Sequence, residues 1–321
     1  MNQTLVQLGN AGLIPVIKIE DAAKAVPLAG ALIRGGLAVA EVTFRTACAP
    51  EAIAAIAKEY PDMLVGAGTV LSVEQVKKAV DSGSKYIVAP GFNPRVVEYC
   101  VKNSIPVTPG CSTPSDMEAA IELGLDVVKF FPAEPSGGLA MLKALSAPYS
   151  QLKFIPTGGI DEKNLQSYLA FDKILACGGS FMVKDDYIKS GDFDKIEELT
   201  AKAVLLVQGF GLGHIGINSE GNDDAVRDAK IISAMFGLTV KDGNSSTFAG
   251  ELIEFMKGNG RGEKGHIAIS TLSCERAVAY LAKMGIEMDE SSIKMNAKGS
   301  INAIYCKELF CGFGLHLLRR A

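Results

Sequence analysis

The first 208 residues repeat one pattern: a short, continuous apolar run followed by an amphipathic stretch, eight times over at a spacing of roughly 20 residues. Continuous apolar runs are typical of parallel strands buried on both faces, and the stretches between them are long enough for a helix and a loop. Eight such units favour closure into a (β/α)8 TIM barrel. An open, doubly wound sheet is the alternative, although no GxGxxG motif follows the first run. We expect strands at 14–19, 39–44, 64–70, 86–90, 106–109, 127–131, 154–156 and 174–183.

Capping residues support the helices expected between these strands. Ser72, Thr113 and Asp161 each precede an amphipathic stretch and carry a side-chain oxygen that can accept from the first free N–H groups of a helix. We expect helices at 21–34, 50–60, 72–82, 94–103, 114–123, 138–145, 162–170 and 193–207.

Composition excludes several classes of function. The 321 residues are 48% hydrophobic, which is enough for a large core, and the net charge of −4 comes from scattered charges without a basic stripe, so nucleic acid is not an expected partner. The seven cysteines include no CxxC pair, as in reduced, cytoplasmic proteins. No signal peptide and no apolar run of about 18 residues is evident, so we expect no membrane association.

One lysine interrupts a predicted buried strand. Lys129 lies in the middle of VVKFFP, residues 127–132. Burying an isolated ammonium is costly, which favours the neutral amine, and a neutral amine is the nucleophile that forms a Schiff base with a carbonyl substrate. The alternative is a lysine near the strand end whose ammonium reaches water.

Other polar residues fall at the carboxyl ends of the predicted strands, where a (β/α)8 barrel carries its active site. Glu41 lies in an apolar strand and is a candidate acid/base partner of Lys129; its alternative role is a structural ion pair with Arg45 or Lys18. Arg45 can bind a substrate carboxylate through two hydrogen bonds, and Thr69 can donate a further one. For Lys18 we expect no more than an effect on the local charge.

Glycine-rich turns follow the last two predicted strands. Gly158 and Gly159 follow the seventh strand, and Gly178-Gly179-Ser180 lies at the matching place in the eighth unit. Without a side chain, the backbone N–H groups of such turns can approach a phosphate, and the loops after strands seven and eight are the usual phosphate site of a barrel. Tight turns without a ligand are the alternative.

Seven motifs follow one another along residues 5–207: EVTFRT (41–46), VGAGTV (65–70), APGFNP (89–94), TPGCSTPSD (108–116), KFFPAE (129–134), PTGGI (156–160) and GGSFMV (178–183). Together they closely resemble the aldolases of 2-keto-3-deoxy-6-phosphogluconate (KDPG), which also act on 4-hydroxy-2-oxoglutarate (KHG). The related phosphogalactonate aldolases are not expected to carry the arginine of EVTFRT. The resemblance therefore favours the gluconate type and keeps the galactonate type as an alternative.

The resemblance implies a class I aldolase, a carbon–carbon lyase that needs no cofactor. Lys129 would form an imine with the C2 ketone, and cleavage of the C3–C4 bond would leave the enamine of pyruvate, releasing glyceraldehyde 3-phosphate or glyoxylate. Glu41 would shuttle protons, while Arg45 and Thr69 would hold the carboxylate. Family members are commonly trimers, so a homotrimer is expected. The other implied substrate contacts are Pro90, Thr157, Gly158, Gly159, Gly179 and Ser180.

Residues 209–321 are additional to a minimal aldolase and contain all three histidines of the chain. QGFGLG, residues 208–213, indicates a linker. Two similar modules follow it, each with a GH-containing strand, a helix (224–236 or 274–283) and further strands. This order predicts an α+β domain of paired βαβββ modules.

The twofold βαβββ pattern resembles the glyoxalase-like, or vicinal-oxygen-chelate, fold, whose metal ligands lie on the first and fourth strands of each module. His214, Glu254, His266 and His316 match those positions and suit Zn²⁺, Ni²⁺, Fe²⁺ or Mn²⁺. Histidines that only pack in the fold are the alternative, and the domain would then be a small-molecule sensor or an oligomerisation module. A further alternative is a regulatory barrel whose C-terminal domain is the functional part.

Overall fold

The computed structural model describes residues 2–320, and the chain forms two compact units, Met1–Val207 and Gln208–Ala321. Each unit has its own strands and its own core. Within the described residues, no helix is both long enough and apolar enough to cross a bilayer.

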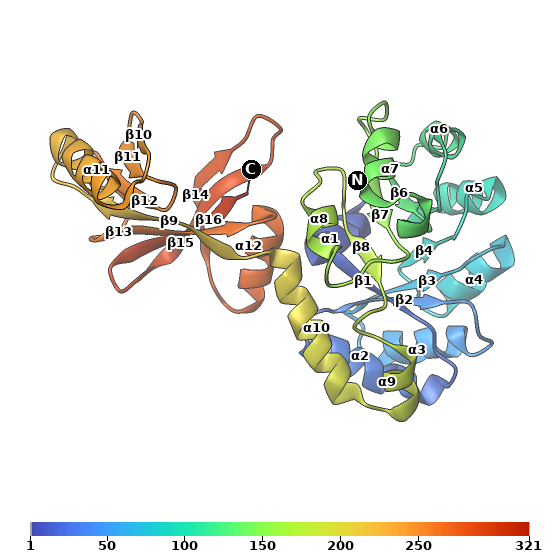
Figure 1. Ribbon diagram of the computed structural model, residues 1–321. Coiled ribbons are helices and arrows are strands. Elements are labelled where there is room, and N and C mark those ends of the chain that lie inside the picture. Colours follow the sequence, from blue (N-terminus) through green and yellow to red (C-terminus); the bar gives the residue numbers. More distant parts are fainter. Residues whose placement is uncertain (1, 321) are drawn as a thin grey trace. The chain divides into compact units, whose positions relative to one another are not determined.

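Eight parallel strands form a barrel in the first unit (Figure 1). Six of them pair in the order β5-β4-β3-β2-β1-β8, and β6 pairs with β7. The bridges Gly110↔Lys129 and Thr157↔Gly178 join the two sheets at both seams and so complete the ring. The strands are β1 (Leu13–Ile17), β2 (Val39–Thr43), β3 (Leu64–Gly68), β4 (Tyr86–Val88), β5 (Val107–Thr108), β6 (Val127–Phe130), β7 (Lys153–Pro156) and β8 (Cys177–Gly179).

Helices cover the outside of this barrel, in the alternation that the apolar pattern predicts. Ser72 and Thr113 cap their helices as expected, whereas Asp161 accepts from the N–H groups of Lys163 and Asn164 in a turn before the helix starts. The helices are α2 (Ala25–Arg34), α3 (Ala49–Glu59), α4 (Val73–Asp81), α5 (Pro94–Lys102), α6 (Pro114–Glu122), α7 (Gly138–Ser146), α8 (Leu165–Leu169) and α10 (Phe193–Gln208), with 3₁₀ turns η1 (Ala22–Lys24) and η2 (Glu134–Ser136).

Two helices of the barrel were not predicted from the sequence. Helix α1 (Gln3–Ala11) precedes the first strand, and α9 (Asp185–Ser190) follows the eighth; both are short. The eighth strand is also shorter than the expected 174–183, because the chain turns after Gly179. Short segments such as these take their conformation from the barrel they pack against more than from their own periodicity.

The second unit is a mixed eight-stranded sheet with two helices, in the strand order β10-β11-β12-β9-β13-β16-β15-β14 (Figure 1). The element order is βαβββ twice. The expected linker at 208–213 is wrong, because Gln208 ends α10 and Gly211 already begins β9. The elements are β9 (Gly211–Asn218), α11 (Asn222–Phe236), β10 (Val240–Asp242), β11 (Ser246–Ala249), β12 (Ile253–Met256), β13 (Gly265–Thr271), α12 (Cys274–Lys283), β14 (Met288–Met295), β15 (Ile301–Phe310) and β16 (Phe313–Arg319).

Candidate functional site

A buried ion pair lies inside the barrel. Lys129 of β6 places its Nζ 3.4 Å from Oε1 of Glu41 of β2, and the two side chains are only 7% and 4% exposed. Within residues 2–320, Glu41 forms no ion pair with Arg45 or Lys18, so the structural pairings considered for it are absent. The pair places a proton acceptor beside an amine in a buried position.

Glycines of β3 make room for this carboxylate. Glu41 pairs in register with Gly66, and a Cβ atom added at Gly68 would lie 2.2 Å from Glu41 Oε1. A Cβ at Gly66 would overlap the ring of Tyr86, whose hydroxyl donates to the carbonyl of Ala40 at 2.9 Å. Sequence reasoning assigned no positioning role to Gly66, Gly68 or Tyr86, although the GAG within VGAGTV was a visible signal of close packing.

We expect Gly68→Ala to displace Glu41 and to lower kcat by about a hundredfold, because a catalytic group moved by about 1 Å loses that much. Steady-state cleavage assays measure the effect, and thermal unfolding of the same preparation shows whether the barrel is intact. A folded variant with wild-type kcat would contradict the proposed position of Glu41.

Arg45 and Thr69 lie together at the carboxyl ends of β2 and β3. Arg45 is exposed, and its Nε donates to Thr69 Oγ1 at 3.4 Å. Thr69 has a φ of 58°, a left-handed conformation that costs a non-glycine residue about 1–3 kcal/mol. The strained residue turns its hydroxyl toward the guanidinium, and the remaining guanidinium donors are available to a carboxylate.

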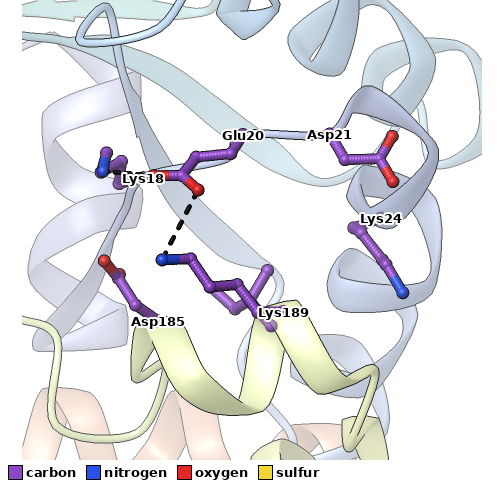
Figure 2. A pocket seen from close by; sticks show the side chains of 7 residues that line it. Lys18, Glu20, Asp21, Lys24, Asp185 and Lys189 are labelled. Atoms are coloured by element: carbon purple, nitrogen blue, oxygen red, sulfur yellow. Dashed lines mark hydrogen bonds and ion pairs between the residues drawn. The ribbon is translucent and has the colours of Figure 1, made fainter.

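Lys18 lies at the end of β1 in a separate pocket beside α9 (Figure 2). Its ammonium binds Glu20 at 2.5 Å, and Glu20 also pairs with Lys189 at 3.5 Å. The hydrogen bond and the charge of Glu20 raise the pKa of Lys18, and Lys18 in turn lowers the pKa of Glu20. Lys18 is therefore engaged with its own acidic partner and not with Glu41.

The glycine turn after β7 directs its polar groups in two directions. Gly158 and Gly159 have φ values of 101° and 83°. The carbonyl of Gly158 accepts from the N–H of Glu134 at 3.0 Å, and that of Gly159 accepts from Asn164 Nδ2 at 2.8 Å. Their own N–H groups have no acceptor within residues 2–320. In an anion-binding turn, successive backbone N–H groups are free to donate to the anion, while the carbonyls of the turn are held by other hydrogen bonds. The Gly158-Gly159 turn has this arrangement.

The neighbouring residues complete this end of the barrel. The bridge between Thr157 and Gly178 places Gly179 and Ser180 alongside the turn. Thr157 Oγ1 is buried, has no hydrogen-bond partner among the described residues and lies against Gly178, where a Cβ would be 2.3 Å away.

Pro90 lies close to the strand of the lysine. Its carbonyl packs against Gly110, where a Cβ would be only 2.1 Å away, and Gly110 bridges to Lys129. The structure therefore places Glu41 and Lys129 within their strands, inside the barrel, and the other predicted barrel residues at or just after the carboxyl ends of their strands.

Three histidines and one glutamate converge in the second unit. His266 Nε2 lies 3.0 Å from both His214 Nε2 and Glu254 Oε2, and His214 Nε2 lies 3.1 Å from the same glutamate oxygen. The nitrogens of His316 and of the other two histidines lie within 4.8 Å of one another. Such a set can hold a divalent metal ion.

The sheet register explains why these side chains meet. Glu254, Gly216 and His266 lie side by side on β12, β9 and β13, and His214 lies opposite Ala268. A Cβ at Gly216 would overlap the imidazole of His266, 2.1 Å from its Cε1.

The second row of the sheet continues the same pattern. His214, Ala268 and His316 lie across β9, β13 and β16. Small residues between the large ones thus leave the space in which the four side chains converge.

The protonation state of His316 suits a metal ligand. Burial, followed by the nearby charges of His266 and His214, lowers the pKa of His316 to about 4, so its imidazole is neutral at physiological pH. Its Nδ1 lies 3.3 Å from the carbonyl of Leu317, while its Nε2 is buried and has no hydrogen-bond partner in the described part of the chain. A donated Nδ1–H leaves the lone pair on Nε2, as in metal-bound histidines.

Glu254 is held as a carboxylate by its neighbours. Burial alone would raise its pKa, but the hydrogen bonds from His214, His266 and Ser246 outweigh that effect and hold the pKa below its usual value. Sequence reasoning missed Ser246 and also Tyr305, whose ring stacks on His316 with centroids 4.6 Å apart. Neither residue carries a local sequence signal, because only strand pairing brings it to the cluster.

Comparison with known proteins identifies relatives of the barrel. The family model for KDPG and KHG aldolase matches residues 6–199. The 2-dehydro-3-deoxy-phosphogluconate aldolase of Treponema pallidum is 50% identical over 195 residues, which are 61% of this chain and 93% of that protein. The KHG/KDPG aldolase of Escherichia coli K12 is 43% identical over 192 residues, 60% of this chain and 90% of the relative.

The chain is also similar to solved structures of aldolases from the same family. A KDPG aldolase from Legionella pneumophila, with pyruvate captured as a covalent carbinolamine intermediate, has a TM-score of 0.61 and 37% identity, covering 63% of this chain and 98% of that one. The corresponding aldolase of Zymomonas mobilis, solved with 3-phosphoglycerate, has a TM-score of 0.59 and 40% identity, covering 63% of this chain and 94% of its own.

Proposed function

The chain belongs to the KDPG and KHG aldolase family, and we propose that it cleaves 2-dehydro-3-deoxy-6-phosphogluconate to pyruvate and glyceraldehyde 3-phosphate, and 4-hydroxy-2-oxoglutarate to pyruvate and glyoxylate. It is a carbon–carbon lyase that works through a Schiff base. A phosphogalactonate-type aldolase is the alternative. The observation that carries the proposal is the buried contact of 3.4 Å between Lys129 Nζ and Glu41 Oε1.

The chemistry begins at the amine. Transfer of the Lys129 ammonium proton to Glu41 frees the nitrogen, which attacks the C2 ketone and forms a carbinolamine. The pyruvate captured as a carbinolamine in the Legionella enzyme is an intermediate of this same kind. Glu41 then returns a proton to the carbinolamine oxygen, water leaves, and a protonated imine remains on Lys129.

Bond cleavage uses the imine as the electron acceptor. Glu41 removes the proton of the C4 hydroxyl through a water molecule, the C3–C4 bond breaks, and its electron pair forms the enamine of pyruvate while the aldehyde departs. Protonation at C3 and hydrolysis of the imine release pyruvate and regenerate the amine. The sequence is redox-neutral and needs only water as a co-reactant.

The remaining residues of the site would bind the two ends of the substrate. Arg45 and Thr69 would hold the C1 carboxylate, because a guanidinium and a hydroxyl lie side by side there. The free N–H groups of Gly158 and Gly159 would hold the phosphate. The path between these two ends of the substrate would be lined by Thr157, Gly179, Ser180 and Pro90. As the assembly we propose a homotrimer.

Borohydride reduction in the presence of pyruvate tests this proposal directly. A reduced imine adds a stable pyruvyl group to one lysine, which intact mass and peptide mapping locate. We expect modification of Lys129 alone. Modification of another lysine, or none in the folded protein, would overturn the assignment of Lys129 as the nucleophile.

For the second unit we propose a glyoxalase-like domain with a bound divalent metal ion. The convergence of His214, Glu254, His266 and His316, together with the unpartnered Nε2 of His316, supports this proposal. A set of three imidazoles and one carboxylate suits Zn²⁺, Ni²⁺, Fe²⁺ or Mn²⁺, and the ion would supply Lewis-acid chemistry there.

We expect the purified chain to contain about one metal ion per protein and to unfold at a lower temperature after chelation, because bound ligands stabilise the folded state. Elemental analysis and thermal unfolding, with and without chelator, measure both effects. His316→Ala should abolish the metal-dependent shift. The matched variant is Tyr305→Phe, which keeps the stacked ring and should retain the metal. Metal-free protein with an unchanged unfolding temperature would remove this proposal.

A further inference from the structure

A buried tyrosine is bonded to Glu134, the residue that packs against the glycine turn of the barrel. Tyr168 of α8 is 1% exposed, and its hydroxyl donates to the carboxylate of Glu134. Burial first, and then this bond, raise the pKa of Tyr168 well above its ordinary value, so the hydroxyl stays protonated and keeps donating. Its partner is an exposed residue of η2.

Glu134 fills the space between this hydroxyl and the turn. A Cβ added at Gly159 would lie 2.6 Å from the Cβ of Glu134, so the glutamate side chain rests directly against that glycine. A Cβ at Gly138 would lie 3.0 Å from Glu134 Oε1 and 3.3 Å from the Tyr168 hydroxyl. The Glu134 side chain, although exposed on its outer side, therefore contacts the turn, the first residue of α7 and the tyrosine.

The backbone on either side of Glu134 is bonded to the same turn. The N–H of Ala133 donates to the carbonyl of Thr157 at 2.8 Å, and that of Glu134 donates to the carbonyl of Gly158 at 3.0 Å. Because the peptide unit is planar, the direction of a carbonyl sets the direction of the N–H that follows it. Holding Glu134 in place thus holds the N–H groups of Gly158 and Gly159 toward the open side.

We propose that Tyr168 is a positioning residue that acts through Glu134 to aim the Gly158-Gly159 turn at the substrate phosphate, and so sets the preference for phosphorylated substrates. This inference rests on the proposed function. The C6 substrate ends in a phosphate ester two carbons beyond the C4 hydroxyl, whereas KHG ends in a carboxylate on the next carbon. If the phosphate binds at the turn as proposed, only the longer substrate reaches it, so the two substrates separate support of the phosphate from chemistry at Lys129.

The test compares both substrates on the same enzyme preparation. We expect Tyr168→Phe to raise KM for KDPG about tenfold, because a charge-assisted hydrogen bond is lost, and to change kcat/KM for KHG by less than about threefold. The ratio of the two kcat/KM values is independent of the fraction of folded enzyme. Tyr149→Phe is the matched control, since Tyr149 donates to an exposed glutamate, Glu118, at 3.1 Å on another part of the barrel.

Two substitutions of the acceptor extend the test. Glu134→Gln keeps an oxygen for the tyrosine hydroxyl and should retain most of the KDPG preference, whereas Glu134→Ala should lower the ratio of the two kcat/KM values as Tyr168→Phe does. Inorganic phosphate as a competitive inhibitor gives a second readout. Its inhibition constant should rise in the variants that lose the bond and stay unchanged in Tyr149→Phe.

Failure of the proposed function and failure of the inference about Tyr168 give different results. Wild-type enzyme that neither traps pyruvate nor cleaves either substrate would remove the proposed function and this inference with it. If the wild type is active and Tyr168→Phe lowers both kcat/KM values equally, the tyrosine is only structural and the inference fails. It fails also if the ratio and the phosphate inhibition constant stay at wild-type values. A selective loss for KDPG in Tyr168→Phe and Glu134→Ala, with the preference largely retained in Glu134→Gln, supports it.

Discussion

Lys129→Met should lower kcat for KDPG cleavage by roughly 10⁵-fold or more, the largest effect expected in this protein. Removing a nucleophile eliminates the covalent route, and losses of this size follow when a covalent catalytic group is deleted. Coupled assay of pyruvate formation measures the rate, and borohydride trapping should leave no pyruvyl adduct. Lys85→Met is the control, since Lys85 is an exposed lysine that binds the carbonyl of Pro61.

A loss of stability must be separated from this loss of chemistry. Lys129→Met leaves Glu41 as a buried carboxylate without its counter-charge, which costs about 3–5 kcal/mol of folding free energy. The double variant Lys129→Met/Glu41→Gln removes both charges and should recover much of the stability in thermal unfolding, yet remain inactive. Activity in that stable double variant would show that the barrel does not use Lys129.

The second large effect is expected at the carboxylate. Glu41→Gln keeps the shape of the side chain but removes the base, and general acid/base groups contribute about 10²–10⁴-fold, so kcat should fall by that factor. The amine remains, so pyruvate should still be trapped on Lys129, only more slowly. Rapid-quench trapping and steady-state kinetics distinguish the two steps.

Proton exchange gives an independent measurement of the same residue. In deuterated water the wild-type enzyme should exchange the methyl protons of pyruvate through the enamine, and Glu41→Gln should slow this exchange by a factor similar to the loss in kcat. Exchange at the wild-type rate would show that another group protonates the enamine. The 3.4 Å contact would then serve only to balance the charge of Lys129.

Much of the barrel could be predicted because its information is local. Each of the eight strands follows from a continuous apolar run, and the caps at Ser72 and Thr113 act within one turn of their helices. The helix Cys274–Lys283 was predicted with its observed bounds. Elements without a strong period of their own, such as α1 and α9, could not be recognised in this way.

For the candidate site, too, the residue types could be predicted from the sequence, but their contacts could not. Sequence indicated Lys129 as a lysine in a buried strand and indicated the glycine turns by composition. It named Lys129 as the partner of Glu41 and kept Arg45 or Lys18 as the alternative. That choice depends on the interior of the barrel, where Lys129 and Glu41 meet although 88 positions separate them. Tyr168 and Glu134, 34 positions apart, are a second pair of this kind.

The sequence by itself determined the succession of βα units, the twofold βαβββ order that follows and the kinds of side chain at the strand ends, because periodicity and capping act between residues a few positions apart. Only the tertiary structure decided which side chains meet. Strand register places Gly68 against Glu41. It also places Gly216 beside His266, and Ala268 between His214 and His316. Register and barrel closure arise from packing between distant segments, so distances of 3 to 4 Å between functional atoms are properties of the assembled fold.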